Sequence, residues 1–297
     1  MYWFITPDVP KEFMLSILKA NTWKGTCTNK IILFAWSTFF FRSIFKKSII
    51  TVEHLSSTDP VIAIFISKKN KQINIHAKDG YPTSIVKQFP RNELENYISE
   101  KSAYEIIPYI LRPLLLDFED KSLKLELEFV SNDEALTNTT ILNFLLSLKS
   151  DKEILLNINE FNEFFNIFKL RSSIDLPTEI LVPKFYLHGD FAPWNLRANK
   201  SMLRATDWEF FHENGWPLYD LFYYIYNYNC LTGKALPSLD SFLKLKVVEE
   251  YLSSLKLTVI QIKFILIATI LHFLKARSEF KAKIIMLDVS ALERAIL

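Results

Sequence analysis

Glycine is scarce in this sequence, with 5 residues among 297. A fold built on repeated glycine-rich loops is therefore not expected. Cysteine is scarcer still, with 2 residues. Cys27 and Cys230 stand far apart, and no Cys-x-x-Cys pair occurs. This pattern excludes a disulfide framework and a cysteine-based zinc site, and it favours a reducing compartment such as the cytoplasm.

The chain also lacks a strong excess of charge of one sign. Its formal net charge is +2, and no long run of Lys and Arg appears, so a nucleic-acid partner is not expected. The short basic stretch Lys68-Lys69-Asn70-Lys71 is typical of a solvated turn. With 49% hydrophobic and 23% charged residues, the composition is that of a globular protein.

Long uncharged apolar runs are missing as well. The longest early one, Ile31–Phe41, is too short to span a bilayer, which needs about 20 residues. Leu257–Leu274 is very apolar but carries Lys263 and His272, which predicts a buried helix. The start of the chain, Met1–Asp8, has neither the basic residues nor the apolar core of a signal peptide.

Residues 1–55 are expected to form an N-terminal extension. Within residues 31–50, phenylalanines and isoleucines segregate from Arg42, Lys46 and Lys47, a pattern that predicts an amphipathic helix. We interpret it first as a helix docked on its own domain. The alternative is a helix lying on a membrane surface, which would give peripheral membrane contact through residues 31–50.

Residues 56–131 have the pattern of a small β-rich lobe. Alternating or continuous apolar runs predict strands, and Asp79-Gly80 predicts a hairpin turn. A helix is expected after Pro90, with Asn92 and Glu95 as its capping box and Pro108 as its end. The predicted strands are Val61–Ser67, Gln72–His76, Thr83–Gln88, Leu114–Phe118 and Leu123–Val130.

After residue 131 the pattern becomes helical. Helices are predicted over Thr137–Leu148 and Ile158–Leu170 and from about Pro217 onwards. The sequence therefore predicts an α+β protein of two lobes, with a small β-rich N-lobe at residues 56–131 and a larger helical C-lobe at residues 132–297.

The strongest chemical signal is a carboxylate and an amide in one short loop, followed by a second carboxylate. Asp190 and Asn195 stand five positions apart, and Asp207 follows a predicted hairpin with its turn at Asn199-Lys200-Ser201. Phosphoryl transfer needs a carboxylate near the accepting hydroxyl and hard oxygen ligands for magnesium. A hairpin of this length can return Asp207 to the vicinity of Asn195.

These motifs resemble the aminoglycoside and choline phosphotransferase family, which has a protein-kinase-like fold. The resemblance is carried by the segments His188-Gly189-Asp190 to Asn195, Thr206-Asp207-Trp208-Glu209 and Gly215-Trp216-Pro217 to Leu221. In particular, the chain is similar to variants from bacterial surface-polysaccharide clusters. The resemblance implies ATP and Mg²⁺ as cofactors, with Asp190 as catalytic base and Asn195 and Asp207 as metal ligands. It also implies that His188 braces the loop backbone and that Asp220 supports the loop from the interior.

The same resemblance calls for a strand lysine that binds phosphate and a helix glutamate that holds it. Lys87 ends a predicted strand and Glu100 stands thirteen residues later in the predicted helix, in the expected order. Lys78 is a rival for the lysine role. Glu93 and Glu95 are rivals for the glutamate role.

The nucleotide base is expected against the segment that links the lobes, where the candidates are Phe129, Val130 and Ser131. The turn over the phosphates would be Lys68-Lys69-Asn70-Lys71, which has no glycine, so GTP in place of ATP stays open.

The expected function is phosphorylation of a small-molecule hydroxyl, with a sugar or surface-glycan precursor as first choice and an aminoglycoside or amino alcohol as the alternative. Acidic residues after position 210 form no dense cluster near Asp220, which favours a neutral or anionic acceptor. The basic segment 31–50 favours a lipid-linked acceptor and a place at the inner face of the membrane. A hypothesis of another class is a pseudokinase that binds without catalysis. The sequence does not decide the oligomeric state.

Overall fold

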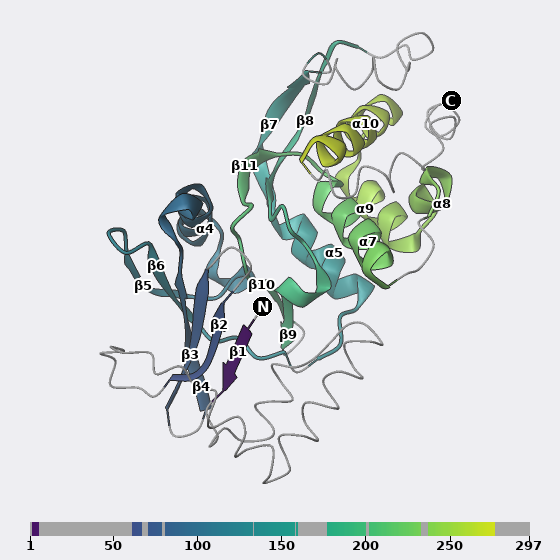
Figure 1. Cartoon of the computed structure of the whole chain (residues 1–297). Coiled ribbons are helices and arrows are strands. Elements are labelled where there is room, and N and C mark those ends of the chain that lie inside the picture. The colour runs from purple at the N-terminus through teal and green to yellow at the C-terminus, as the bar shows by residue number, and fades with distance from the viewer. Residues whose placement is uncertain are drawn as a thin grey trace. The chain divides into compact units, whose positions relative to one another are not determined.

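The computed structural model of the chain describes residues 2–5, 61–66, 71–78, 81–132, 134–157, 159, 177–199, 202–232 and 237–276 (Figure 1). Contacts divide the chain into two compact units. The first, unit 1, comprises Met1–Ala135 together with Trp194–Glu209, and unit 2 comprises Leu136–Pro193 and Phe210–Leu297. The segment Trp194–Glu209, which the sequence assigns to the C-lobe, thus groups with the N-terminal part of the chain.

Unit 1 is built on a six-stranded antiparallel sheet in the order β1-β2-β3-β4-β6-β5. Its strands are β1 (Tyr2–Ile5), β2 (Val61–Ile66), β3 (Gln72–Lys78), β4 (Tyr81–Gln88), β5 (Leu115–Glu119) and β6 (Lys124–Glu128). The five strands predicted from the sequence are confirmed, and Lys78 pairs with Tyr81 across the predicted hairpin, whose turn residues lie outside the described part. Strand β1 was not predicted.

Helix α4 (Leu94–Ile106) follows strand β4 along the chain and buries Tyr97, Ala103 and Tyr104. The predicted capping box is wrong. A 3₁₀ turn, η1 (Arg91–Glu93), takes up Asn92, so the α-helix begins at Leu94, one residue later than a cap at Asn92 would place it. Its N-cap residue, Glu93, makes no side-chain cap hydrogen bond. The helix stops before Pro108 as predicted, and the 3₁₀ turn η2 (Tyr109–Leu111) leads on to β5.

The hairpin predicted around Asn199-Lys200-Ser201 is confirmed. It consists of β9 (Leu196–Asn199) and β10 (Met202–Ala205), paired antiparallel, and it is preceded by the 3₁₀ turn η5 (Pro193–Asn195). The hairpin is tied to the segment after β6, because the Ala198 amide donates to Asn132 (3.1 Å) and Asn199 donates to Ser131 (2.9 Å).

Unit 2 combines a three-stranded antiparallel sheet, in the order β11-β8-β7, with helices. Its elements are α5 (Asn138–Ser147), β7 (Lys149–Asn157), β8 (Glu179–Leu187), β11 (His212–Gly215), α7 (Tyr219–Thr232), α8 (Leu239–Leu243), α9 (Lys246–Leu255) and α10 (Val259–Ala276). Strands β7 and β8 were not predicted, and the helix expected over Ile158–Leu170 falls outside the described residues apart from Asn159.

Aromatic side chains form a cluster in the core of unit 2. Phe222 stacks on Tyr226 with ring centroids 4.0 Å apart, and Phe242 packs edge-on against Phe222. The apolar segment predicted as a buried helix is α10, whose residues Phe264–Leu271 are buried. Trp216 donates to Thr269 on this helix at 2.9 Å.

The α+β class, with a small β-rich part and a helical part, is therefore confirmed. None of the helices in the described ranges is long and apolar enough to cross a membrane. The amphipathic helix expected at residues 31–50 lies outside those ranges, as does the rest of the extension 1–55 apart from β1. The lobe limits drawn from the sequence remain a prediction.

Candidate functional site

The sheet of unit 1 presents one face of alternating residues to a cavity. On β4, Lys87 pairs with Ile73 of β3. Ile85, also on β4, pairs with Ile75 of β3 on one side and with Leu127 of β6 on the other. Because side chains two positions apart share a face of a strand, these residues form one wall. They line a cavity of about 250 Å³, whose other lining residues include Pro113, Glu128, Phe129, Val130, Asn132, Asn195, Arg197, Thr206 and Asp207.

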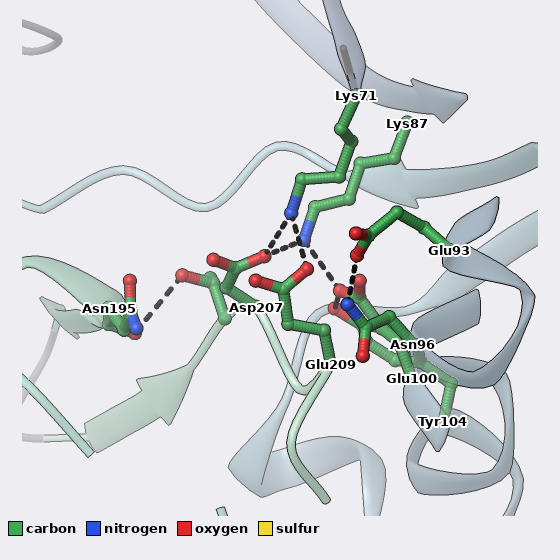
Figure 2. Close-up of polar contacts among 10 residues, drawn as sticks. Lys71, Lys87, Glu93, Asn96, Glu100, Tyr104, Asn195, Asp207 and Glu209 are labelled. Atoms are coloured by element: carbon green, nitrogen blue, oxygen red, sulfur yellow. Dashed lines mark hydrogen bonds and ion pairs between the residues drawn. The ribbon is translucent and has the colours of Figure 1, made fainter. Parts of the chain in front are cut away.

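The predicted pair of Lys87 and Glu100 is present. The Lys87 Nζ lies 2.5 Å from Glu100 Oε1, and both residues are buried (Figure 2). Tyr104, one turn further along α4, donates its hydroxyl to the same carboxylate oxygen at 3.3 Å. Burial lowers the pKa of Lys87, but Asp207 and Glu100 outweigh it and raise this pKa above its ordinary value. Lys87 therefore stays charged.

Asp207 is the second residue after β10, and its backbone adopts a left-handed conformation with φ of 68°. Such a conformation is strained for a residue with a Cβ, and strain of this kind is concentrated at functional sites. The preceding residue, Thr206, donates both its amide (2.8 Å) and its hydroxyl (3.0 Å) to the Asn195 carbonyl. These two bonds bring the predicted metal ligands, Asn195 and Asp207, to the same wall of the cavity.

Two lysines converge on Asp207. The Oδ1 atom accepts hydrogen bonds from Lys87 at 2.7 Å and from Lys71 at 3.1 Å (Figure 2). Burial acts to raise the pKa of Asp207, but the charges of Lys87 and then Lys71 are stronger and hold this pKa well below its usual range. Asp207 is thus a carboxylate at any physiological pH, as a ligand for a divalent cation must be.

In the sequence analysis, Lys71 was placed in the turn over the phosphates and Glu209 in the motif of Asp207, but neither was singled out as a site residue. Lys71 is only 7% exposed, so the expectation of a solvated turn is wrong for this residue. Its Nζ also lies 2.9 Å from Glu209 Oε2. Burial and the nearby charge of Asp207 raise the pKa of Glu209, and Lys71 opposes that rise. The position of Glu209, two residues after Asp207, was the signal that could have identified it.

The donor set fits magnesium rather than zinc. Asn195 and Asp207 offer an amide and a carboxylate oxygen, the hard ligands that magnesium prefers, and magnesium keeps several waters. Within the ranges that the structure describes, no group of three or more His, Cys, Asp or Glu side chains forms a candidate metal centre. A site with two protein ligands, completed by phosphate and water, agrees with both observations.

The residues expected near the nucleotide base divide between two cavities. Phe129 and Val130 line the cavity described above, together with the apolar residues of β3 and β4. Ser131 lines a neighbouring cavity of about 210 Å³ instead, with Arg204, Asn199 and Met202. The Phe129 amide donates to the Thr83 carbonyl at 3.1 Å, so this amide is used for pairing within unit 1.

In unit 2, a buried carboxylate organises the loop that carries Asp190. Asp220, the second residue of α7, accepts hydrogen bonds from the amides of His188 (2.7 Å) and Gly189 (3.0 Å). Burial raises the pKa of Asp220 to about 7, against these two amides, which lower it. The His188 ring in turn accepts from the Asp190 amide at 3.3 Å. The supporting contacts expected of His188 and Asp220 are therefore present.

Two further features fix this loop. Gly189 has a φ of 77°, and a Cβ at this position would lie 2.2 Å from the Phe210 carbonyl oxygen, so only glycine fits. Tyr223, which is buried on α7, donates its hydroxyl to Asp190 Oδ1. This tyrosine is another residue that the sequence analysis did not single out.

No protein-family model matches the chain, and no curated protein matches it. Among solved structures, the chain is similar to the choline kinase LicA from Streptococcus pneumoniae, with 16% identity, a TM-score of 0.42 and coverage of 86% of this chain and 98% of that one. It is also similar to the amicoumacin kinase hAmiN in complex with AMP-PNP, Ca²⁺ and Ami, with 10% identity, a TM-score of 0.39 and coverage of 82% and 85%.

Proposed function

We propose that the chain transfers the γ-phosphoryl group of ATP to a hydroxyl of a small molecule, with Mg²⁺ as the metal. One observation carries the proposal: Lys87 and Asp207 line one cavity and are paired, and Lys87, on a strand, is also paired with Glu100 in the following helix. A strand lysine held by a helix glutamate, beside a metal-binding aspartate, is the arrangement by which kinases hold nucleotide phosphates.

Each residue of the arrangement has a role in this proposal. Lys87 binds the α- and β-phosphates, and Asn195 and Asp207 hold the magnesium ion, which neutralises phosphate charge when bound. Ile73, Ile75, Ile85 and Leu127 supply apolar surface for the base, beside Phe129 and Val130. Asp190 accepts the proton of the attacking hydroxyl. GTP remains an alternative nucleotide.

A sugar or surface-glycan precursor is the acceptor we propose first, since the motifs around Asp190 and Asp207 resemble phosphotransferases of surface-polysaccharide clusters. An aminoglycoside or an amino alcohol is the alternative acceptor. We further propose that the enzyme works in the cytoplasm, where ATP is available, and that residues 31–50 provide peripheral contact with the inner face of the membrane.

The test is a screen for ADP release with ATP and Mg²⁺ against sugars, glycolipid precursors, amino alcohols and aminoglycosides. We expect turnover with one acceptor class and its loss in Asp190→Ala and in Asp207→Ala. Asp151→Ala, which removes an exposed carboxylate of β7, is the matched control and should keep full activity. ATP binding without turnover on any acceptor would favour the pseudokinase hypothesis, and absence of ATP binding would contradict both.

A further inference from the structure

The two lysines at Asp207 are arranged alike. Both donate to the same oxygen, Asp207 Oδ1, and each also has a glutamate of its own. Lys87 has Glu100 at 2.5 Å, and Lys71 has Glu209 at 2.9 Å. Figure 2 shows the two side chains running side by side into the cluster from neighbouring parts of the sheet. The site therefore contains two lysine–glutamate pairs that share one aspartate.

Lys71 is a buried residue whose ammonium group is fixed by charged partners. Its side chain is 9% exposed, and its ammonium group also lies 5.4 Å from the centre of the Phe89 ring. Withdrawing an ammonium group from water is costly unless charged partners replace the water. Asp207 and Glu209 replace it here, and together with Glu100 they raise the pKa of Lys71 against the effect of burial.

The sharing of Asp207 has a consequence for what the lysines can bind. If Asp207 Oδ1 turns to a cation, each lysine loses one hydrogen bond but keeps its own glutamate. Both ammonium groups then stay in place, and each can offer to another acceptor the N–H that Asp207 had accepted. A phosphate oxygen is the acceptor that suits two neighbouring ammonium groups.

The sequence just before Lys71 supports the same inference. Residues 68–70 contain no glycine. Phosphate-binding loops rely on glycine because its lack of a Cβ lets backbone amides approach the phosphates. A chain without those glycines needs positive charge from another source, and Lys71, the next residue along the chain, can provide it.

We infer that Lys71 is a second phosphate-binding lysine, positioned by Glu209 as Lys87 is positioned by Glu100, and that it takes over the task of a glycine-rich loop. The inference rests on the proposed function, since it names the part of the same nucleotide that Lys71 contacts. The ligand group is a nucleoside di- or triphosphate, and the adenosine part does not contact Lys71.

The test compares equilibrium binding of ATP, ADP and adenosine by calorimetry, once with a chelator and once with Mg²⁺. In Lys71→Met we expect ATP to bind about tenfold to a hundredfold more weakly, as for loss of a charge-assisted hydrogen bond. Adenosine should bind as it does to the wild type. Lys184→Met is the matched control, because Lys184 is as buried as Lys71 and pairs with Glu213 at 3.0 Å.

A neutral pair, Lys71→Met with Glu209→Gln, covers the case in which the single variant leaves Glu209 without its partner and fails to fold. It should show the same selective loss of ATP binding. Equal losses for ATP and adenosine in both variants would mean a purely structural role and would overturn the inference. Unchanged ATP binding would overturn it while leaving the proposed function intact, whereas a wild type that binds no ATP would overturn both.

A further outcome concerns Glu209 itself. If Glu209→Gln loses Mg²⁺ binding while Lys71→Met keeps its affinity for ATP, then Glu209 serves the metal and the inference is wrong. If Glu209→Gln keeps Mg²⁺ binding and weakens ATP by a smaller factor than Lys71→Met, the inference is supported.

Discussion

Replacing Lys87 with Met should destabilise the protein mainly through the carboxylate that it leaves behind. Glu100 is fully buried. The substitution removes its ion pair with Lys87 and leaves it the hydrogen bond from the Tyr104 hydroxyl at 3.3 Å. Removing one partner of a buried ion pair costs about 3–5 kcal/mol. That is a large part of the roughly 5–15 kcal/mol by which domains are stable. Met keeps most of the lysine's apolar stem, so lost packing adds little.

The double variant Lys87→Met with Glu100→Gln separates the two sources of destabilisation. Because it removes the unpaired charge, it should recover at least about 2 kcal/mol of the loss in the single variant. Urea unfolding followed by tryptophan fluorescence measures both, since Trp208 is buried in the same unit. Lys78→Met, at the exposed end of β3, is the control. Equal stabilities of the single and double variants would refute the reasoning.

Three more predictions concern the loop of Asp190. Because burial raises the pKa of Asp220 to about 7, the contribution of Asp220 to stability should be greatest below about pH 4 and be lost as the pH rises to 7. Asp220→Asn should remove this slope in melting temperatures measured across that range. Gly189→Ala should cost more than about 2 kcal/mol, and a melting temperature equal to that of the wild type would contradict the steric argument. Tyr223→Phe should lower kcat about tenfold with an unchanged KM for ATP, since it removes one hydrogen bond to Asp190. An unchanged kcat would show that this bond does not position the base.

The pair of Lys87 and Glu100 was predicted from the resemblance to kinases, which calls for a strand lysine followed by a helix glutamate. Their order along the chain fits that requirement, while Glu93 and Glu95 stayed open as rivals of Glu100. The proximity of Asn195 and Asp207 could be predicted from the chain itself, since a short hairpin joins them and must return the chain to its starting point.

Lys71 and Glu209 could not be predicted in this way. A lysine among other basic residues is normally solvated, and its burial here depends on a carboxylate 138 positions away. Strand β7 was missed because most of its residues are exposed or half-buried, which leaves little apolar alternation to recognise. The start of α4 was misplaced because Asn92, expected as its cap, lies inside the 3₁₀ turn that precedes the helix.

The chain returns to unit 1 at Trp194 after it has begun unit 2, and this has a practical consequence for anyone who shortens the protein. A fragment that stops at Ala135 would retain both lysines and the whole six-stranded sheet but would lack Asp207 and Glu209. Its two ammonium groups would face each other with Glu100 as the one carboxylate left from the cluster. Such a truncation would convert an attractive network into a repulsive one, so the N-terminal half is not a self-sufficient piece of protein.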